Sequence, residues 1–156
     1  METFIRYLAV GVGGAFGAMT RYHLTGSWLS RVAAPFPTAT FVINVSGSFV
    51  VGFLLTLITD RITASPHLRL AIATGFVGAY TTFSTFEYET AKLVEQQKYL
   101  IAGLNVILSL VIGFGAVWSG MTMAKKLESS QGTVRVADAA LHTSGVETTP
   151  DVIDDE

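Results

Sequence analysis

Residues 75–86 read GFVGAYTTFSTF, and they set the first constraint on the structure of this chain. This stretch lies inside an apolar segment, yet it contains two glycines, four Ser or Thr hydroxyls and three phenylalanines. The glycines followed by a Thr-Thr pair predict a helix that is broken near Gly75–Thr82. A break frees backbone N–H and C=O groups, which lipid cannot satisfy. Such a break is tolerated where it lines a cavity or holds an ion, so the stretch predicts a functional site within a membrane.

Four apolar stretches predict an all-α membrane protein with four transmembrane helices. Residues 36–59 and 99–124 carry no charge, and both exceed the roughly 18 to 20 residues that cross a bilayer. Residues 70–86 are also uncharged, and residues 7–20 form a shorter Gly-rich stretch between two arginines. This first stretch is long enough only if it continues past the second arginine toward Leu29. A signal peptide is the alternative interpretation of the N-terminus.

Composition divides the chain into two parts. Half of the residues are hydrophobic and 14% are charged, against about 25% in soluble domains. Residues 1–126 hold nine Lys or Arg and five Asp or Glu, whereas residues 127–156 hold one Arg and seven acids. We therefore expect a four-helix membrane domain over 1–126 and an acidic, disordered tail over 127–156. The absence of cysteine excludes a disulfide framework and a thiolate metal site. The basic residues are scattered singly, which argues against a nucleic-acid partner.

The charge count barely selects an orientation in the membrane. With four crossings, the two termini lie on the same side. That side carries six basic residues, namely Arg6, Arg61, Arg69, Lys125, Lys126 and Arg135, and the other side carries four, namely Arg21, Arg31, Lys92 and Lys98. Because positive loops normally fix orientation, a six-to-four count predicts insertion either way up and an antiparallel dimer. The alternative is that folding or a translocation factor sets one orientation.

Polar and aromatic residues inside the spans point to an ion path. Asn44, Asn105 and Arg21 are expensive within a bilayer and usually face a bundle interior or a water-filled path. The carbonyls that a break frees suit a cation such as Na⁺. Phe83 and Phe86 lie three residues apart on one helical face, and aromatic ring edges are positive enough to flank a small anion. Ordinary core or lipid contacts are the alternative reading of both rings.

Three motifs carry a family resemblance. They are Gly13-Gly14-x-x-Gly17-Ala18-x-x-Arg21-Tyr22, Thr40-x-x-x-Asn44-x-x-Gly47-Ser48-Phe49, and Gly75-x-x-Gly78-x-x-Thr81-Thr82-Phe83-Ser84-Thr85-Phe86. With them the chain resembles the Fluc fluoride channels, also called CrcB proteins, over most of residues 4–124. The resemblance implies a multi-pass protein of the bacterial plasma (inner) membrane. It also implies an antiparallel, dual-topology homodimer that exports fluoride passively and gives fluoride resistance.

The resemblance also implies roles for particular residues. Phe83 and Phe86 are similar to the pair of rings beside the family's fluoride path, and Asn44 is similar to its amide donor. Further candidates for the path are Ser84, Thr85 and Ser109, with Arg21 beside them. Backbone carbonyls of Gly78 and Thr81 would hold a structural Na⁺ shared by two subunits. The chain departs from the family pattern at Ala79-Tyr80, where Gly-Phe is common, and in its acidic tail.

Other functions have weaker support in the sequence. A small four-helix, dual-topology drug/proton antiporter would need a carboxylate in the membrane. No Asp or Glu lies between Thr3 and Ile58, and Glu87 and Glu89 stand at the end of the third span. An intramembrane hydrolase would need a nucleophile with a base or a metal, but the three histidines form no triad or ligand spacing, so we expect no enzyme. A purely structural membrane subunit is the remaining option.

Overall fold

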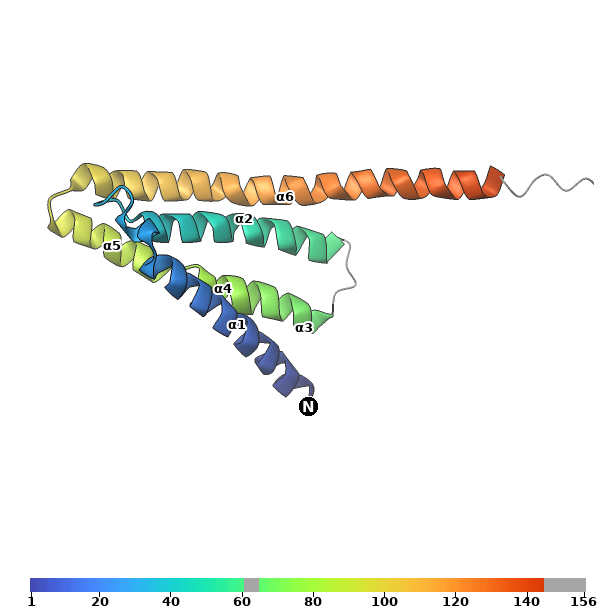
Figure 1. Ribbon diagram of the computed structural model, residues 1–156, viewed down its shortest axis with the longest axis horizontal. Helices are drawn as coiled ribbons and strands as arrows, with labels where there is room; N and C mark the ends of the chain where they lie inside the picture. Colours follow the sequence, from blue (N-terminus) through green and yellow to red (C-terminus); the bar gives the residue numbers. More distant parts are fainter. Residues whose placement is uncertain (61–64, 145–156) are drawn as a thin grey trace, which may run out of the picture.

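The computed structural model describes residues 1–60 and 65–144, and this part of the chain is helical throughout, as the sequence predicts. The elements are α1 (Glu2–Gly26), the short 3-10 helix η1 (Trp28–Arg31), α2 (Thr38–Asp60), α3 (Pro66–Arg69), the π-helical η2 (Leu70–Val77), α4 (Gly78–Tyr80), α5 (Phe83–Glu95) and α6 (Tyr99–Ser144). Elements α3 to α5 follow one another in a single interrupted rod (Figure 1).

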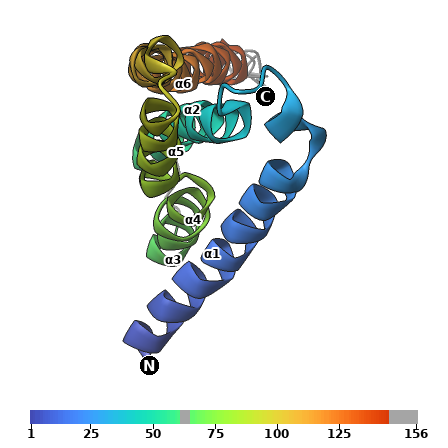
Figure 2. The same cartoon turned by 90° about the vertical axis from the view of Figure 1, so that its left-hand side faces the viewer.

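The chain passes along the molecule four times in alternating directions (Figure 1). Helix α6 packs chiefly on α2, and α1 packs chiefly on η2 and α4. Figure 2 shows α1 inclined to the other helices, with α3 and α4 of the interrupted rod beside it. Helix α2 therefore contacts both α6 and the elements on either side of the interruption. The candidate cavity lies where these elements meet.

Two helices of the described part are long and apolar enough to cross a bilayer, namely Thr38–Ile58 within α2 and Tyr99–Leu127 within α6. They agree closely with the predicted spans 36–59 and 99–124. The first predicted span, 7–20, lies within the longer α1, which ends at Gly26 and so does not reach Leu29. The third, 70–86, lies within the interrupted rod.

Close backbone packing explains the glycines that the motifs share. A Cβ atom placed on Gly13 would overlap the carbonyl of Ala71, and one placed on Gly17 would overlap the carbonyl of Phe76. On the facing helix, a Cβ on Gly75 would lie 2.7 Å from the carbonyl oxygen of Val10. These glycines therefore let α1 and η2 touch backbone to backbone, which is how small residues stabilise helix pairs in lipid.

The break is real, but the glycines do not cause it. Gly75 and Gly78 both lie in helical backbone, and among the described residues no glycine has a positive φ. The helix stops instead at Thr81 and Thr82, whose ψ angles of 157° and 112° are extended. β-Branched residues are stiff at χ1 and favour extended backbone, which suits them to this point. The predicted window was therefore right at its C-terminal end and wrong about the role of glycine.

The predicted tail, residues 127–156, begins within helix α6. Helix α6 continues through the end of the second span to Ser144, whereas the sequence predicted irregular chain from Leu127. The segment 127–144 contains no proline, and several alanines, together with Leu, Lys, Glu or Gln around its start, favour helix. The last part of the predicted tail, residues 145–156, lies outside the described residues.

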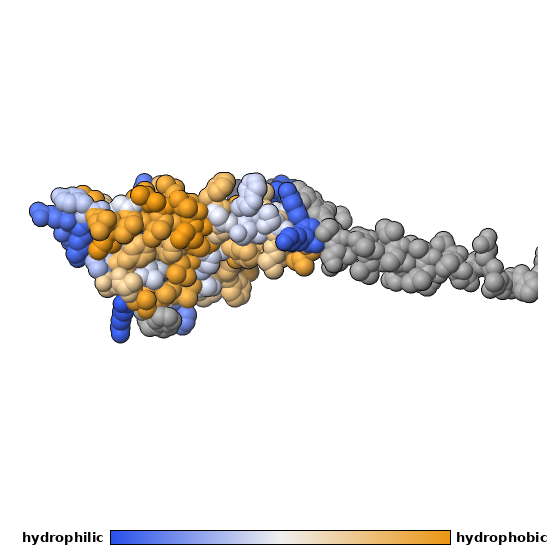
Figure 3. Space-filling view, turned by 90° about the horizontal axis from the view of Figure 1, so that it is seen from above, coloured by the Kyte–Doolittle hydropathy of each residue, from blue (hydrophilic) through white to orange (hydrophobic). Residues whose placement is uncertain are grey.

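Much of the molecule's surface is apolar. Large apolar side chains are exposed along the outer faces of α1 and α6, among them Phe4, Tyr7, Phe16, Ile107, Leu110, Phe114 and Trp118. Figure 3 shows apolar residues gathered in the middle of one face and hydrophilic residues toward its two ends. A surface of this kind marks contact with lipid or with another protein rather than with water.

Candidate functional site: a cavity at the helix break

A cavity of about 440 Å³ lies where α2, α6 and the interrupted rod meet. Its lining consists of Asn44, Gly47, Ser48 and Val51 from α2, Ala73, Val77, Gly78, Thr81, Thr82, Phe83 and Phe86 from the rod, and Ser109 and Leu110 from α6. No charged side chain belongs to this lining. The polar groups that face it are amides, hydroxyls and backbone.

Asn44 holds the break in place. Its side-chain Nδ2 donates to the carbonyl of Thr82 at 3.0 Å, and its Oδ1 accepts from the Thr82 N–H at 2.8 Å. The amide thus replaces the backbone acceptor that a continuous helix would give the Thr82 N–H, and it adds a donor to the Thr82 carbonyl. One N–H of Nδ2 remains for another acceptor, because a side-chain amide has two. Asn44 is therefore both a structural clamp and a free donor at the cavity.

The clamp has a consequence for two backbone carbonyls. In a continuous helix the Thr82 N–H would donate to the carbonyl of Gly78, but here it donates to Asn44. Likewise the Thr85 N–H, the usual donor to the carbonyl of Thr81, donates to the Thr82 hydroxyl at 3.2 Å. The carbonyls of Gly78 and Thr81 have therefore lost their intrahelical donors, and these are the two predicted to hold Na⁺.

Neighbouring residues of α2 fix the other side of the break. Gly47 leaves room for the methyl group of Thr81, since a Cβ at residue 47 would overlap it. Ser46 Oγ lies 2.8 Å from the hydroxyl of the buried Tyr80. Helix α2 thus contacts three successive residues at the interruption. Ser46 contacts Tyr80, Gly47 contacts Thr81 and Asn44 contacts Thr82.

Two phenylalanines stand just past the break. The ring centroids of Phe83 and Phe86 are 5.8 Å apart with 36° between their planes, and both rings line the cavity. Phe83 is 70% exposed, so its ring projects beyond the packing of this single chain. Behind Phe86, its carbonyl accepts from Thr90 Oγ1 at 2.7 Å, which in turn accepts from the fully buried Asn105 at 2.8 Å. Asn105 thereby fixes α5, and with it Phe86, against α6.

Ser109 brings an unpaired hydroxyl to the cavity wall. Its Oγ is buried and has no hydrogen-bond partner within the described part of the chain. Buried hydroxyls without a protein partner are uncommon, and such a group is free to bond to a water or an ion. Ser109 therefore offers a donor at a point where the chain itself supplies no acceptor.

The structure gathers some predicted site residues and leaves others apart. Asn44, Phe83, Phe86 and Ser109 share one cavity with Gly78 and Thr81. Three others do not line it, namely Arg21, Ser84 and Thr85: Arg21 is half-buried on α1, Ser84 is exposed, and the hydroxyl of Thr85 accepts from Thr82 Oγ1 at 2.8 Å.

The sequence did not single out Ser48 or Thr82 as site residues, although both line the cavity. Ser48 stands one helical turn beyond Asn44 on the same face, so helical spacing was a signal for it. Thr82 owes its position to a partner 38 residues away, for which no short spacing exists.

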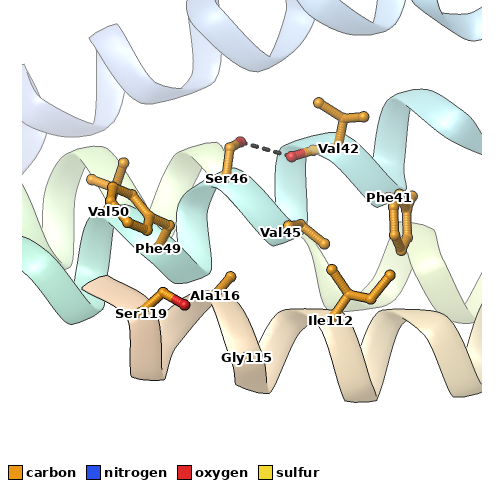
Figure 4. A pocket seen from close by; sticks show the side chains of 10 residues that line it. All are labelled: Phe41, Val42, Val45, Ser46, Phe49, Val50, Ile112, Gly115, Ala116 and Ser119. Carbon is orange, nitrogen blue, oxygen red and sulfur yellow. Dashed lines mark hydrogen bonds between the residues drawn. The ribbon is translucent and has the colours of Figure 1, made fainter. Parts of the chain in front are cut away.

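A larger hollow lies between α2 and α6, with a volume of about 670 Å³ (Figure 4). Its walls are almost entirely apolar, with Phe41, Val45 and Ile112 among them, and Figure 4 shows the hydroxyl of Ser46 turned to the carbonyl of Val42, to which it donates at 2.7 Å. It offers an ion few free donors. The cavity at the break is therefore the better candidate site despite its smaller size.

The fold and the uncharged cavity define a helical membrane-type protein with an interrupted helix at its site. A family model described as CrcB-like protein, Camphor Resistance (CrcB), matches residues 8–121, so the chain belongs to this family. One relative, from Solibacter usitatus, is 43% identical over 122 residues, which are 78% of this chain and 100% of that protein. Another, from Acidobacterium capsulatum, is 46% identical over 124 residues, 79% of this chain and 98% of its own. Both are named fluoride-specific ion channel FluC.

Proposed function

We propose that the chain forms a fluoride-selective channel through which fluoride leaves the cytoplasm passively. The observation that carries the proposal is the single uncharged cavity in which Asn44, Ser109 and the two phenylalanines meet. Fluoride is small and tightly hydrated, so a path must replace its water with donors; the amide, the hydroxyl and the ring edges are such donors. The names of the relatives support the same function.

The absence of a charge from the cavity lining suits conduction. An ion must bind well enough to enter and weakly enough to leave, and several neutral sites achieve this better than one fixed cation. In this mechanism the free N–H of Asn44 and the Ser109 hydroxyl donate to fluoride. Phe83 and Phe86 then pass the ion along their edges. Chloride, which is larger and holds its water less tightly, gains less from such contacts.

The working unit in this proposal is an antiparallel homodimer in a bacterial inner membrane, with each chain crossing four times. Three features support it. Phe83 is mostly exposed although it lines the cavity, so a second chain is well placed to close that wall. The apolar faces of α1 and α6 need a cover of lipid or protein. The basic residues are nearly balanced, six against four, between the two predicted sides of the membrane.

A structural Na⁺ belongs to the same proposal. The carbonyls of Gly78 and Thr81 have lost their helical donors, and backbone carbonyl oxygens are suitable ligands for a hard cation. Gly78 is exposed at the cavity, where a second chain can approach it. When bound, the ion would neutralise the partial negative charge of these oxygens near a path for anions.

A drug/proton antiporter is not favoured. Such a protein needs a carboxylate where its substrate binds, and neither Glu87 nor Glu89 lines the cavity. Glu87 is exposed on α5, one residue beyond Phe86.

Ion efflux from liposomes that contain only the purified protein tests the function. With a potassium ionophore to balance charge, we expect rapid release of fluoride and almost no release of chloride. Release of both halides at similar rates would refute selectivity. Fluoride release no faster than from protein-free liposomes, with the protein shown to be inserted, would refute the channel itself.

A further inference from the structure

A second hollow, of about 460 Å³, lies toward the ends of α2 and the interrupted rod. Its lining includes Arg6 from α1, Leu55 from α2, and Arg69, Ala73 and Thr74 from the rod. Ala73 also lines the cavity at the break, so this second hollow and the cavity are neighbours.

The two hollows also follow one another along α2. Ser48 and Val51 line the cavity, and Leu55 lines the second hollow. These positions are three and four residues apart, which places them on one face of the helix. A continuous face of α2 therefore leads from the uncharged cavity to a region bordered by two arginines.

Positive charge at this end is only partly neutralised. The side chain of Arg6 is 54% exposed, and its Nε lies 3.3 Å from Glu2 Oε1. The same carboxylate oxygen lies 3.6 Å from His67 Nε2. Arg69 is exposed, and no ion pair of Arg69 is recorded within residues 1–60 and 65–144. One acid thus stands against two arginines, and the hollow keeps a net positive charge.

We infer that Arg6 and Arg69 form an anion-attracting mouth to the cavity at the break. The inference rests on the proposed function, because the anion that the mouth supplies is fluoride. The mouth and the cavity have different roles in this inference. Fixed charge at the mouth raises the local concentration of anions, as charged clefts do, while the neutral donors of the cavity take the ion without trapping it.

The phosphate of an anionic lipid has the same chemistry and is the alternative occupant of the mouth. The position of the mouth beside the cavity, with Ala73 in both linings, favours a small ion that moves on over a headgroup that stays. The experiments therefore run in liposomes of neutral lipid and again in liposomes with anionic lipid.

The potential at the mouth is measurable without any flux. The chain has no cysteine, so Thr74→Cys places a single thiol in the hollow. The ratio of its reaction rates with an anionic and a cationic methanethiosulfonate reports the local potential, because the same thiolate attacks both reagents and displaces the same methanesulfinate. In neutral liposomes we expect Arg69→Gln, combined with Arg6→Gln, to lower the anionic-to-cationic rate ratio about tenfold, in keeping with the effect of charged clefts on local ions.

Fluoride flux then tests whether the potential serves transport. At a low, constant fluoride concentration, Arg69→Gln should reduce flux about threefold at low salt. The difference should vanish when ionic strength rises from about 10 mM to about 1 M, because the Debye length falls from about 30 Å to about 3 Å. Arg69→Lys should restore the wild-type rate and its dependence on salt.

Lys125→Gln is the matched control, since it removes an exposed positive charge outside the hollow and on the same predicted side of the membrane as Arg69. An equal effect of Lys125→Gln would overturn the inference, as would an effect confined to anionic lipid. Unchanged thiol ratios in the double arginine variant would overturn it as well. A shifted thiol ratio in a protein that carries no fluoride would instead refute the proposed function and leave the charged mouth standing.

Discussion

Thr82 makes two hydrogen bonds with one side-chain amide, that of Asn44, across 38 residues of sequence. The arrangement converts a helix break, which is costly in lipid, into a satisfied turn with two carbonyls to spare. The side chain of Asn44 therefore stabilises the break itself, in addition to its proposed role as a donor to fluoride.

The first prediction follows from this double role. Asn44→Ala should destabilise the folded protein by about 2 kcal/mol, since it leaves the buried Thr82 N–H without a partner. It should also reduce fluoride flux, by removing a donor. Denaturation in detergent and efflux from liposomes measure the two effects. Ser48→Ala, on the same face of α2 but outside the clamp, is the control, and equal stability of the two variants would contradict the clamp.

Phe83 and Phe86 give the second prediction. Phe→Ile at either position keeps much of the apolar bulk but removes the ring quadrupole, so stability should change little. Fluoride flux should fall tenfold or more if about 1.4 kcal/mol of stabilisation is lost at a barrier. Phe→Met should retain more flux, because a thioether is polarizable.

Phe114→Ile is the matched control for the rings. Phe114 is 72% exposed on α6, stacks on Trp118 and does not line the cavity. Its replacement should leave flux unchanged. Wild-type flux through correctly assembled Phe83→Ile and Phe86→Ile proteins would show that the rings serve only packing.

Sequence patterns predicted which residues share a face of a helix better than they predicted which residues bond to one another. The spacing of Asn44 and Ser48, and of Phe83 and Phe86, placed these pairs on shared faces, and all four line the cavity. The same reasoning treated Asn44 as a donor alone, because a helical repeat says nothing about a bond to backbone 38 residues away. Thr85 was assigned to the path for its hydroxyl, which is in fact engaged with Thr82 at the start of α5.

At the scale of the elements, glycine acts through contact and not through flexibility. Gly13, Gly17 and Gly75 bring α1 and η2 together where a Cβ would collide with backbone. The interruption comes instead from Thr81 and Thr82, held by α2. A glycine-rich sequence within a span is compatible with a flexible break and with close helix packing, since both need a residue without a side chain. Only the position of the neighbouring backbone distinguishes the two.

Two glycines of α1 allow a matched test of this reading, the third prediction. Gly13→Ala should destabilise the protein by several kcal/mol or prevent assembly, because its Cβ would meet the backbone of Ala71, which has no room to move. Gly11→Ala meets nothing within 4 Å. It should therefore stabilise the helix by up to about 1 kcal/mol. Thermal melting in detergent compares the two, and similar losses in both would contradict close packing.

The proposed Na⁺ connects the broken element to its partner chain and gives the fourth prediction. Prolonged exchange of Na⁺ for a large organic cation should weaken the dimer, because the carbonyls of Gly78 and Thr81 would lose their ligand. A site filled to 100 times its Kd contributes about 2.7 kcal/mol. Size-exclusion chromatography and thermal melting follow the loss, and re-addition of Na⁺ but not K⁺ should reverse it. Indifference of a fully depleted protein to Na⁺ would exclude the ion.

For the whole molecule, hydropathy predicted α2 and the apolar part of α6, Tyr99–Leu127, to within a few residues. It understated α1, which carries Glu2, Arg6 and Arg21 within one helix. It also predicted irregular chain from Leu127, where α6 continues to Ser144, because the apolar periodicity of the sequence ends there. The general lesson is physical: burial leaves a pattern in sequence, whereas helix propensity alone leaves a weak one.

The fifth prediction concerns orientation, which an antiparallel dimer requires to be mixed. A compartment-sensitive reporter fused to the C-terminus should be active on both sides of the membrane in wild type, because six basic residues against four give little preference. Arg31→Gln with Lys98→Gln changes the count to six against two and should place the termini uniformly on the cytoplasmic side. That variant should then lose flux, since each chain lacks an inverted partner, although every cavity residue is unchanged. A uniform orientation of the wild type would refute the antiparallel dimer, and full flux from a uniformly oriented variant would show that a single chain or a parallel pair already encloses the fluoride path.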